Sequence, residues 1–130
     1  MAGIELTPEQ VKLVQEPNFG ALATVMPDGS PQVTILWVDY RDGLIWVNTQ
    51  QGRAKPRNMD RDPRVALTIW DRDDPYERMH VRGRVVETTT EGAADHIRWL
   101  NNKYHGNDNY PLAPDAVRVI YKIEPEHVTS

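Results

Sequence analysis

The sequence predicts a mainly β fold, an antiparallel sheet closed or partly closed into a barrel, with flanking helices. Three observations predict it. Segments of alternating apolar and polar residues outnumber helical ones, short turns join most of them, and strands and helices do not alternate as a parallel sheet requires. The length of 130 residues fits one domain, 1–130.

The first half predicts a helix followed by three strands. Thr7 and Gln10 can form a capping box around Pro8, which suits the first helical position, so a helix should run to about Gln15. Alternating patterns bounded by turn residues predict strands over 19–26, 31–40 and 44–48. The turns at 27–30 and 41–43 are short, so these strands should form a meander of adjacent antiparallel hairpins.

The second half predicts two helices among three further strands. A helix over 52–61 tolerates Pro56 only in its first turn. Thr88 and Glu91 favour a second capping box, with a helix over 89–105 that buries one stripe at helical spacing. The remaining segments predict strands over 64–70, 78–87 and 116–124, which makes six strands in all.

Composition excludes several classes of protein. The formal net charge of -4 disfavours a general nucleic-acid binder, which needs an excess of Lys and Arg. No apolar run reaches the roughly 20 residues of a membrane span, and the first residues lack the pattern of a secretion signal, so we expect a cytoplasmic protein. Cysteine is absent, which removes thiol chemistry, and any redox activity then requires a bound cofactor.

Common catalytic and nucleotide-binding motifs are also missing. The sequence contains no GxGxxG, P-loop, HExxH or GxSxG pattern. Its four histidines lie far apart and share no ligand spacing, so we expect no metal site. No side chain stands out as an obligatory acid or base, and the catalytic residues are not predicted.

One segment carries a local positive charge. Over residues 53–64 the sequence contains five cationic and two acidic residues, Asp60 and Asp62, which gives a local charge of +3 within an acidic chain. The cationic residues are Arg53, Lys55, Arg57, Arg61 and Arg64. The segment opens a predicted helix, where free backbone N–H groups favour an anion. It therefore predicts a phosphate site, although a solvated basic helix would show the same composition. The polar end of the preceding strand, Asn48-Thr49, favours the phosphate site.

Three runs of this sequence resemble a known family. They are GALATVMPDGSPQVTILWV, LIWVNT and GRAKPRNMDRDPRVAL, and together they resemble the pyridoxamine 5'-phosphate oxidase-like superfamily of split β-barrels. The resemblance covers about residues 10–125. It is nearest to the branch that uses the deazaflavin coenzyme F-420 in place of FMN.

The resemblance implies a homodimer that holds its cofactor at the subunit interface. The strand over 31–40 should run along the cofactor ring. The polar end of the next strand, Asn48-Thr49, should follow, and Lys55 and its neighbours should bind the phosphate. The second subunit should contribute the start of the strand at 78–87. The implied cofactor-binding residues are Gln32, Val33, Thr34, Ile35, Leu36, Trp37, Asn48, Thr49, Arg53, Lys55, Arg57, Asn58, Tyr76, Arg78 and Met79, with Glu77 beside them.

The implied activity is hydride transfer between reduced F-420 and an unsaturated or conjugated small molecule. Trp37 and Tyr76 could wall the substrate pocket, although Trp37 could equally be a core residue. Pyridoxamine phosphate oxidases carry further C-terminal basic and histidine residues, whereas this sequence has only His127 there, which argues against that substrate. An FMN-dependent oxidoreductase and a carrier that binds cofactor without turnover remain alternatives.

Overall fold

The computed structural model describes residues 3–130, which form three helices and seven strands. The helices are α1 (Pro8–Gln15), α2 (Ala54–Arg61) and α3 (Ala93–His105). The strands are β1 (Phe19–Val25), β2 (Pro31–Trp37), β3 (Asp39–Arg41), β4 (Leu44–Gln50), β5 (Arg64–Trp70), β6 (Arg78–Thr89) and β7 (Arg118–Thr129).

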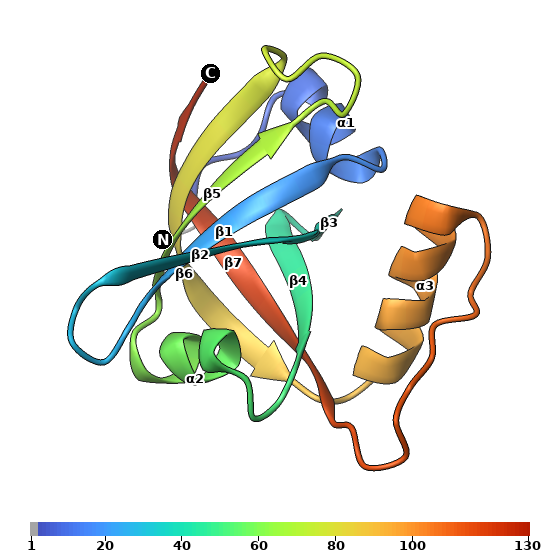
Figure 1. Cartoon of the computed structure of the whole chain (residues 1–130). Coiled ribbons are helices and arrows are strands. Elements are labelled where there is room, and N and C mark those ends of the chain that lie inside the picture. The colour runs from blue at the N-terminus through green and yellow to red at the C-terminus, as the bar shows by residue number, and fades with distance from the viewer. Residues whose placement is uncertain (1–2) are drawn as a thin grey trace.

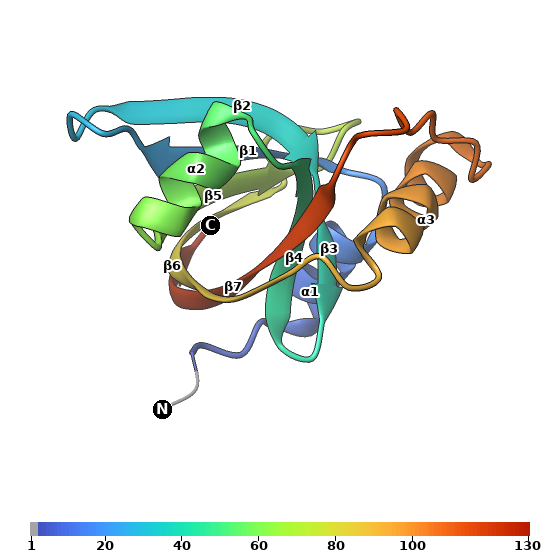
Figure 2. The ribbon, with the colours of Figure 1, turned by 90° about the horizontal axis from the view of Figure 1, so that it is seen from below.

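All neighbouring strands in the described sheet are antiparallel, in the order β2-β1-β5-β6-β7-β4-β3. The sheet curls until β2 approaches β4, which gives the half-open barrel of Figures 1 and 2. This architecture confirms the prediction of a mainly β split barrel with flanking helices.

The predicted meander is wrong in one respect. The segment 31–40 is not one strand, because the chain breaks at Val38 into β2 and β3. The Val38 backbone leaves the ladder: its N–H donates to the Tyr104 hydroxyl at 3.0 Å and its carbonyl accepts from Lys103 Nζ at 2.6 Å. The β1–β2 and β3–β4 hairpins form as predicted, but β2 and β3 lie at opposite ends of the strand order. The sheet therefore has seven strands where six were predicted.

The predicted capping box at Thr88 and Glu91 is also absent. Strand β6 continues to Thr89 because it stays paired with β7, and the N-cap of α3 is Gly92. Strand β7 likewise runs to Thr129 instead of ending near 124, because its second half pairs with the start of β6. The Thr7–Gln10 capping box of α1 forms as predicted.

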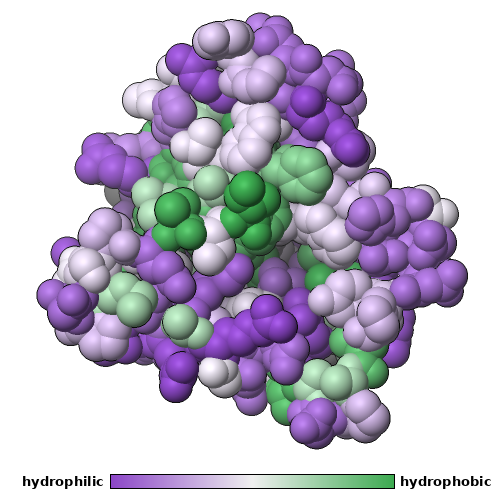
Figure 3. Space-filling view, viewed as in Figure 1, coloured by the Kyte–Doolittle hydropathy of each residue, from purple (hydrophilic) through white to green (hydrophobic). Residues whose placement is uncertain are grey.

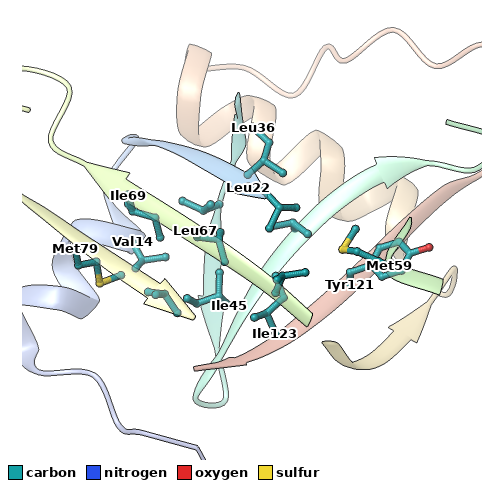
Figure 4. Close-up of a cluster of buried hydrophobic side chains, with 14 of the residues drawn as sticks. Val14, Leu22, Leu36, Ile45, Met59, Leu67, Ile69, Met79, Tyr121 and Ile123 are labelled. Carbon is teal, nitrogen blue, oxygen red and sulfur yellow. The ribbon is translucent and has the colours of Figure 1, made fainter. Parts of the chain in front are cut away.

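The barrel interior is filled from the sheet and from both short helices. Val14 of α1 and Met59 of α2 are buried among side chains of the strands, including Leu22, Ile45 and Ile123 (Figure 4). Burial of such side chains contributes the main driving force for folding. No helix within residues 3–130 is long and apolar enough to cross a membrane.

The remaining helix, α3, packs against β4 and β7 on the outside of the barrel (Figure 2). Its buried stripe contains Ala93, Ile97 and Leu100, as the helical spacing predicted. This arrangement places the connection from α3 to β7 beside the ends of β2 and β4. The chain between β4 and α2 reaches the same region, since Gln51 donates its N–H to the Val117 carbonyl at 2.9 Å.

Candidate functional site

Three cations converge where β4, α2 and β7 meet. Arg53 and Lys55 come from the start of α2, and Arg118 opposes Gln50 in the register of β4 and β7. We call these three residues the cationic cluster. Burial lowers the pKa of Lys55, and the charges of Arg53 and Arg118 lower it further. Burial also lowers the pKa of Arg118. In the described part of the chain none of the three forms an ion pair with a carboxylate.

Backbone donors add to this positive charge. Arg53 is the N-cap of α2 and makes no side-chain capping bond, so the first-turn amides of Ala54 and Lys55 are left without that partner. The helix dipole favours an anion at the same point. The cationic cluster and the helix start therefore form a site suited to a phosphate group.

The other basic residues of the segment are engaged elsewhere. Arg61 donates to the carbonyls of Val25 and of the Asn58 side chain, at 2.9 and 2.8 Å. Arg64 forms a two-pronged ion pair with Asp62. Arg57 is exposed and donates to the Arg53 carbonyl. The basic run predicted from the sequence thus contributes two members, Arg53 and Lys55, to the cationic cluster.

Asn48 connects this cluster to the interior. Its Oδ1 accepts from Arg118 Nε at 2.9 Å, and its Nδ2 donates to the Ala93 carbonyl at 2.9 Å. The next residue, Thr49, is buried on the same strand. Arg118 is also flanked by the ring of Tyr110, whose centroid lies 5.4 Å from its Cζ.

Strand β2 divides the predicted ring-binding residues between two faces, because successive side chains of a strand point to opposite sides. Val33 and Ile35 are 65% and 68% exposed. Figure 3 shows hydrophobic side chains gathered near the centre of the face where β1 and β2 lie in front. Gln32, Thr34 and Leu36 point the other way.

A small cavity of about 240 Å³ lies beside the exposed face of β2. Ile35, Trp37 and Tyr110 give it apolar walls, while Asn48 and Arg118 give it polar ones. Trp37 also stacks on Tyr104 with ring centroids 5.0 Å apart. Trp37 is half-buried, packs against α3 and lines this cavity, and its role as a wall of a substrate pocket stays a prediction.

Two predicted cofactor ligands are bonded to each other. Asn58 Nδ2 donates to Gln32 Oε1 at 3.2 Å and to the Thr24 hydroxyl at 3.0 Å. Asn58 is buried. These bonds attach α2 to the β1–β2 hairpin and hold the helix start in place beside β2.

The predicted residues at the start of β6 lie apart from the cationic cluster. Tyr76 is 84% exposed in the loop between β5 and β6, and its carbonyl accepts from Arg78. That loop lies beside α1, at the end of the barrel opposite α2 (Figure 1). Met79 is 1% exposed in the core, so its side chain faces away from any surface ligand.

Sequence reasoning missed Arg118 and Tyr110 as site residues. Both follow α3, and nothing in their local pattern separates them from an ordinary strand and loop. The β4–β7 register brings Arg118 beside Gln50, and that register is visible only in the folded sheet. Within residues 3–130 no three histidine or acidic side chains gather in a way that could hold a metal ion.

The fold is the split barrel of flavin-binding oxidoreductases. A sequence profile described as pyridoxamine 5'-phosphate oxidase matches residues 6–130, so the chain belongs to that family.

Solved structures agree with this assignment. An F-420 reductase is similar at 34% identity and a TM-score of 0.82, covering 91% of this chain and 94% of its own. A conserved hypothetical protein from Mycobacterium tuberculosis has 24% identity and a TM-score of 0.68, over 98% and 86% of the two chains. An FAD-binding protein from Mesorhizobium loti has 22% identity and a TM-score of 0.64, over 95% and 92%. The last two likenesses concern the fold alone.

Proposed function

We propose that this protein is an oxidoreductase dependent on the deazaflavin coenzyme F-420. The observation that carries the proposal is the cationic cluster at the start of a helix, in which partly desolvated Lys55 and Arg118 lie beside exposed Arg53 without a carboxylate partner among the described residues. A phosphate there would relieve their mutual repulsion and accept charge-assisted hydrogen bonds. The 34% identity to an F-420 reductase supports this cofactor over others.

The residues present fit such a cofactor. Arg53, Lys55 and Arg118 would hold its phosphate, with the amides at the start of α2. The exposed apolar side chains of Val33 and Ile35, together with Trp37, offer a surface for a planar ring. Thr34 points to the opposite face of β2 and does not contribute to this surface.

In the proposed reaction the bound deazaflavin supplies a hydride to an unsaturated or conjugated small molecule. The protein's own contribution is to orient the ring by packing and to fix the phosphate by charge. Trp37 and Tyr110 exclude water from one side of the cavity. Asn48 holds Arg118, and no side chain beside the cavity is assigned as an obligatory acid or base.

We further propose that the protein works as a homodimer, each chain being a single domain over 1–130. Val33 and Ile35 form an exposed apolar strip on a strand at the end of the sheet, which a second copy could cover. The loop with Tyr76 and Arg78 lies far from the cationic cluster of its own chain, as expected if it serves the site of the other chain. A cytoplasmic location with a small-molecule substrate and no nucleic acid completes the proposal.

FMN is the second candidate cofactor, because its phosphate would satisfy the same cationic cluster. Titration of the purified protein with F-420 and with FMN, followed by absorbance and fluorescence, separates the two. The proposal expects tighter binding of F-420, and oxidation of reduced F-420 by some member of a panel of quinones and enones. Tighter binding of FMN would favour the second candidate. Binding without turnover across the panel would indicate a carrier.

A further inference from the structure

A buried chain of hydrogen bonds leads away from the cationic cluster. Asn48 Nδ2 lies 3.1 Å from His96 Nδ1, and His96 Nε2 lies 2.9 Å from Asp39 Oδ2. Asn48, His96 and Asp39 are 8%, 5% and 2% exposed. We call these three residues the buried triad. They come from β4, α3 and β3, so the triad joins the three elements behind Arg118.

The partners of Asn48 fix the direction of every bond in the triad. The Arg118 guanidinium can only donate, so the Asn48 atom that faces it must be Oδ1. The Ala93 carbonyl can only accept, so the Asn48 atom that faces that carbonyl must be Nδ2. The second Nδ2 hydrogen then points at His96 Nδ1, which must accept with a lone pair. The proton of a neutral His96 consequently lies on Nε2 and is donated to Asp39.

The surroundings of Asp39 keep its carboxylate able to accept the hydrogen bond from His96 Nε2. Burial on its own raises the pKa of Asp39, but the hydrogen bond from His96 and the charge of Arg41 outweigh it and hold the pKa below its ordinary value. Arg41 Nε lies 2.7 Å from the same carboxylate oxygen, and the Tyr40 amide donates to the other. The carboxylate therefore stays ionised and orients the imidazole.

We propose that His96 is a positioning residue for the cofactor phosphate, holding Arg118 through Asn48 only while its ring is neutral. The inference rests on the proposed function, since the anion in question is the cofactor phosphate. It adds a residue that touches no ligand and makes binding sensitive to pH.

Protonation of His96 would conflict with the triad. A hydrogen on Nδ1 would face the two hydrogens of Asn48 Nδ2. Rotating the Asn48 amide would relieve that contact but would turn Nδ2 toward Arg118 and Oδ1 toward the Ala93 carbonyl. Two hydrogen bonds would then be replaced by a donor–donor contact and an acceptor–acceptor contact. Arg118 would lose the bond that holds it, while its other neighbour, the Tyr110 ring, would not restore the same geometry.

Aromatic rings and charged groups surround His96. Trp46 and Trp99 cover the imidazole, with ring centroids 5.5 and 6.3 Å away. The charged groups that face the triad or its covering rings are Asp39 and Arg41 on β3, Lys103 on α3, and Arg118 and Lys122 on β7.

The test compares dissociation constants for F-420 and FMN between pH 5.5 and 8 in the wild type and in His96→Gln. Glutamine can accept from Asn48 and donate to Asp39 but does not titrate. We expect wild-type affinity to fall on acidification by about tenfold or more, the value of one charge-assisted bond. At each pH, dividing the wild-type constant by the His96→Gln constant for the same ligand cancels any titration of that ligand. We expect His96→Gln to bind like the wild type at pH 8 and to show no loss of affinity at acidic pH. His80→Gln, on the exposed face of β6, is the matched control and should keep the wild-type profile.

Two results would overturn the inference. One is an acid loss in His96→Gln equal to that of the wild type. The other is a ¹⁵N spectrum of the ligand-free protein at pH 8 in which Nδ1 of His96 carries the proton. That spectrum needs no cofactor and remains readable if a variant fails to fold. If neither F-420 nor FMN binds the wild type, the proposed function fails, and the spectrum still decides the direction of the triad.

Discussion

Arg118 Nε donates to Asn48 Oδ1 at 2.9 Å, which joins the beginning of β7 to the end of β4. The two residues are 70 positions apart in the chain. Their bond places a desolvated guanidinium beside Arg53 and Lys55, and it links the cationic cluster to His96 and Asp39. The proposed cofactor site is therefore supported from the interface between α3 and the barrel as well as from the start of α2.

Removing either half-buried cation of the cluster should weaken binding of a phosphate-bearing cofactor. A charge-assisted hydrogen bond is worth roughly 1.5–3 kcal/mol, so Lys55→Ala and Arg118→Gln should each raise the dissociation constant by about ten- to a hundredfold. Arg82→Gln, an exposed cation on β6, serves as the control. Titration by fluorescence measures all three. Unchanged affinity in Lys55→Ala would show that the phosphate lies elsewhere.

Cofactor affinity should decrease at alkaline pH because Lys55 loses its charge. Burial and two neighbouring cations hold its pKa below the ordinary 10.5, so the free protein loses this charge earlier than a solvated lysine would. A bound anion favours the charged form and raises the pKa again, so affinity should fall as pH rises through the lowered pKa. Lys55→Arg keeps the charge and should show a flatter profile. Calorimetry in buffers of different ionisation enthalpy should detect proton uptake on binding to the wild type, and its absence would contradict the assignment.

Thr34→Val should change stability without changing binding. The Thr34 hydroxyl is buried without a partner among the described residues, so replacing it by a methyl should leave the free energy of unfolding equal or raise it by about 1 kcal/mol. Cofactor affinity should stay at the wild-type value, because Thr34 points to the opposite face of β2 from Val33 and Ile35. In the control Thr68→Val, the lost hydroxyl bonds His80 and lies on another strand. A fall in affinity in Thr34→Val would place Thr34 in the site after all.

Lys103 should make folding stability depend on pH. Its Nζ donates to the carbonyls of Val14 and Val38, and burial lowers its pKa to about 8. Between about 8 and the ordinary 10.5 the unfolded chain holds a proton on this group that the folded protein has lost. The free energy of unfolding should therefore rise with pH across this range.

Urea unfolding of the wild type and Lys103→Met across this range measures the effect. The difference between the two free energies should change with pH in favour of the wild type. Lys12→Met, an exposed lysine on α1, should instead give a curve parallel to the wild type. Parallel curves for Lys103→Met would show that the lysine titrates normally in the folded protein.

Local patterns were sufficient for most elements of the fold. The capping box at Thr7, the turn residues around Gly29 and Gly43 and the alternation of β5 and β6 are all short-range signals, and the corresponding elements formed. The break at Val38 was not predictable in this way. It depends on Lys103 and Tyr104 of α3, more than 60 residues away, which bond the Val38 backbone and draw it out of the ladder.

Some residues of the candidate site were predictable from local sequence patterns, and others only from the folded structure. Lys55 and Arg53 were identified from a local excess of charge, and Asn48 from its place at a strand end. The same pattern could not separate them from Arg61 and Arg64, whose partners Val25 and Asp62 become evident only in the folded chain. Arg118 and His96 escaped because their roles come from the β4–β7 register and from the packing of α3.

The central claim is that the cationic cluster binds the phosphate of F-420. The most direct measurement is a titration of the wild type and of Arg118→Gln with F-420, with FMN run in parallel. The account predicts saturable binding of F-420 to the wild type, weaker binding of FMN, and a loss of F-420 affinity of about tenfold or more in the variant. Failure of F-420 to bind the folded wild type, or equal affinity in Arg118→Gln, would contradict it.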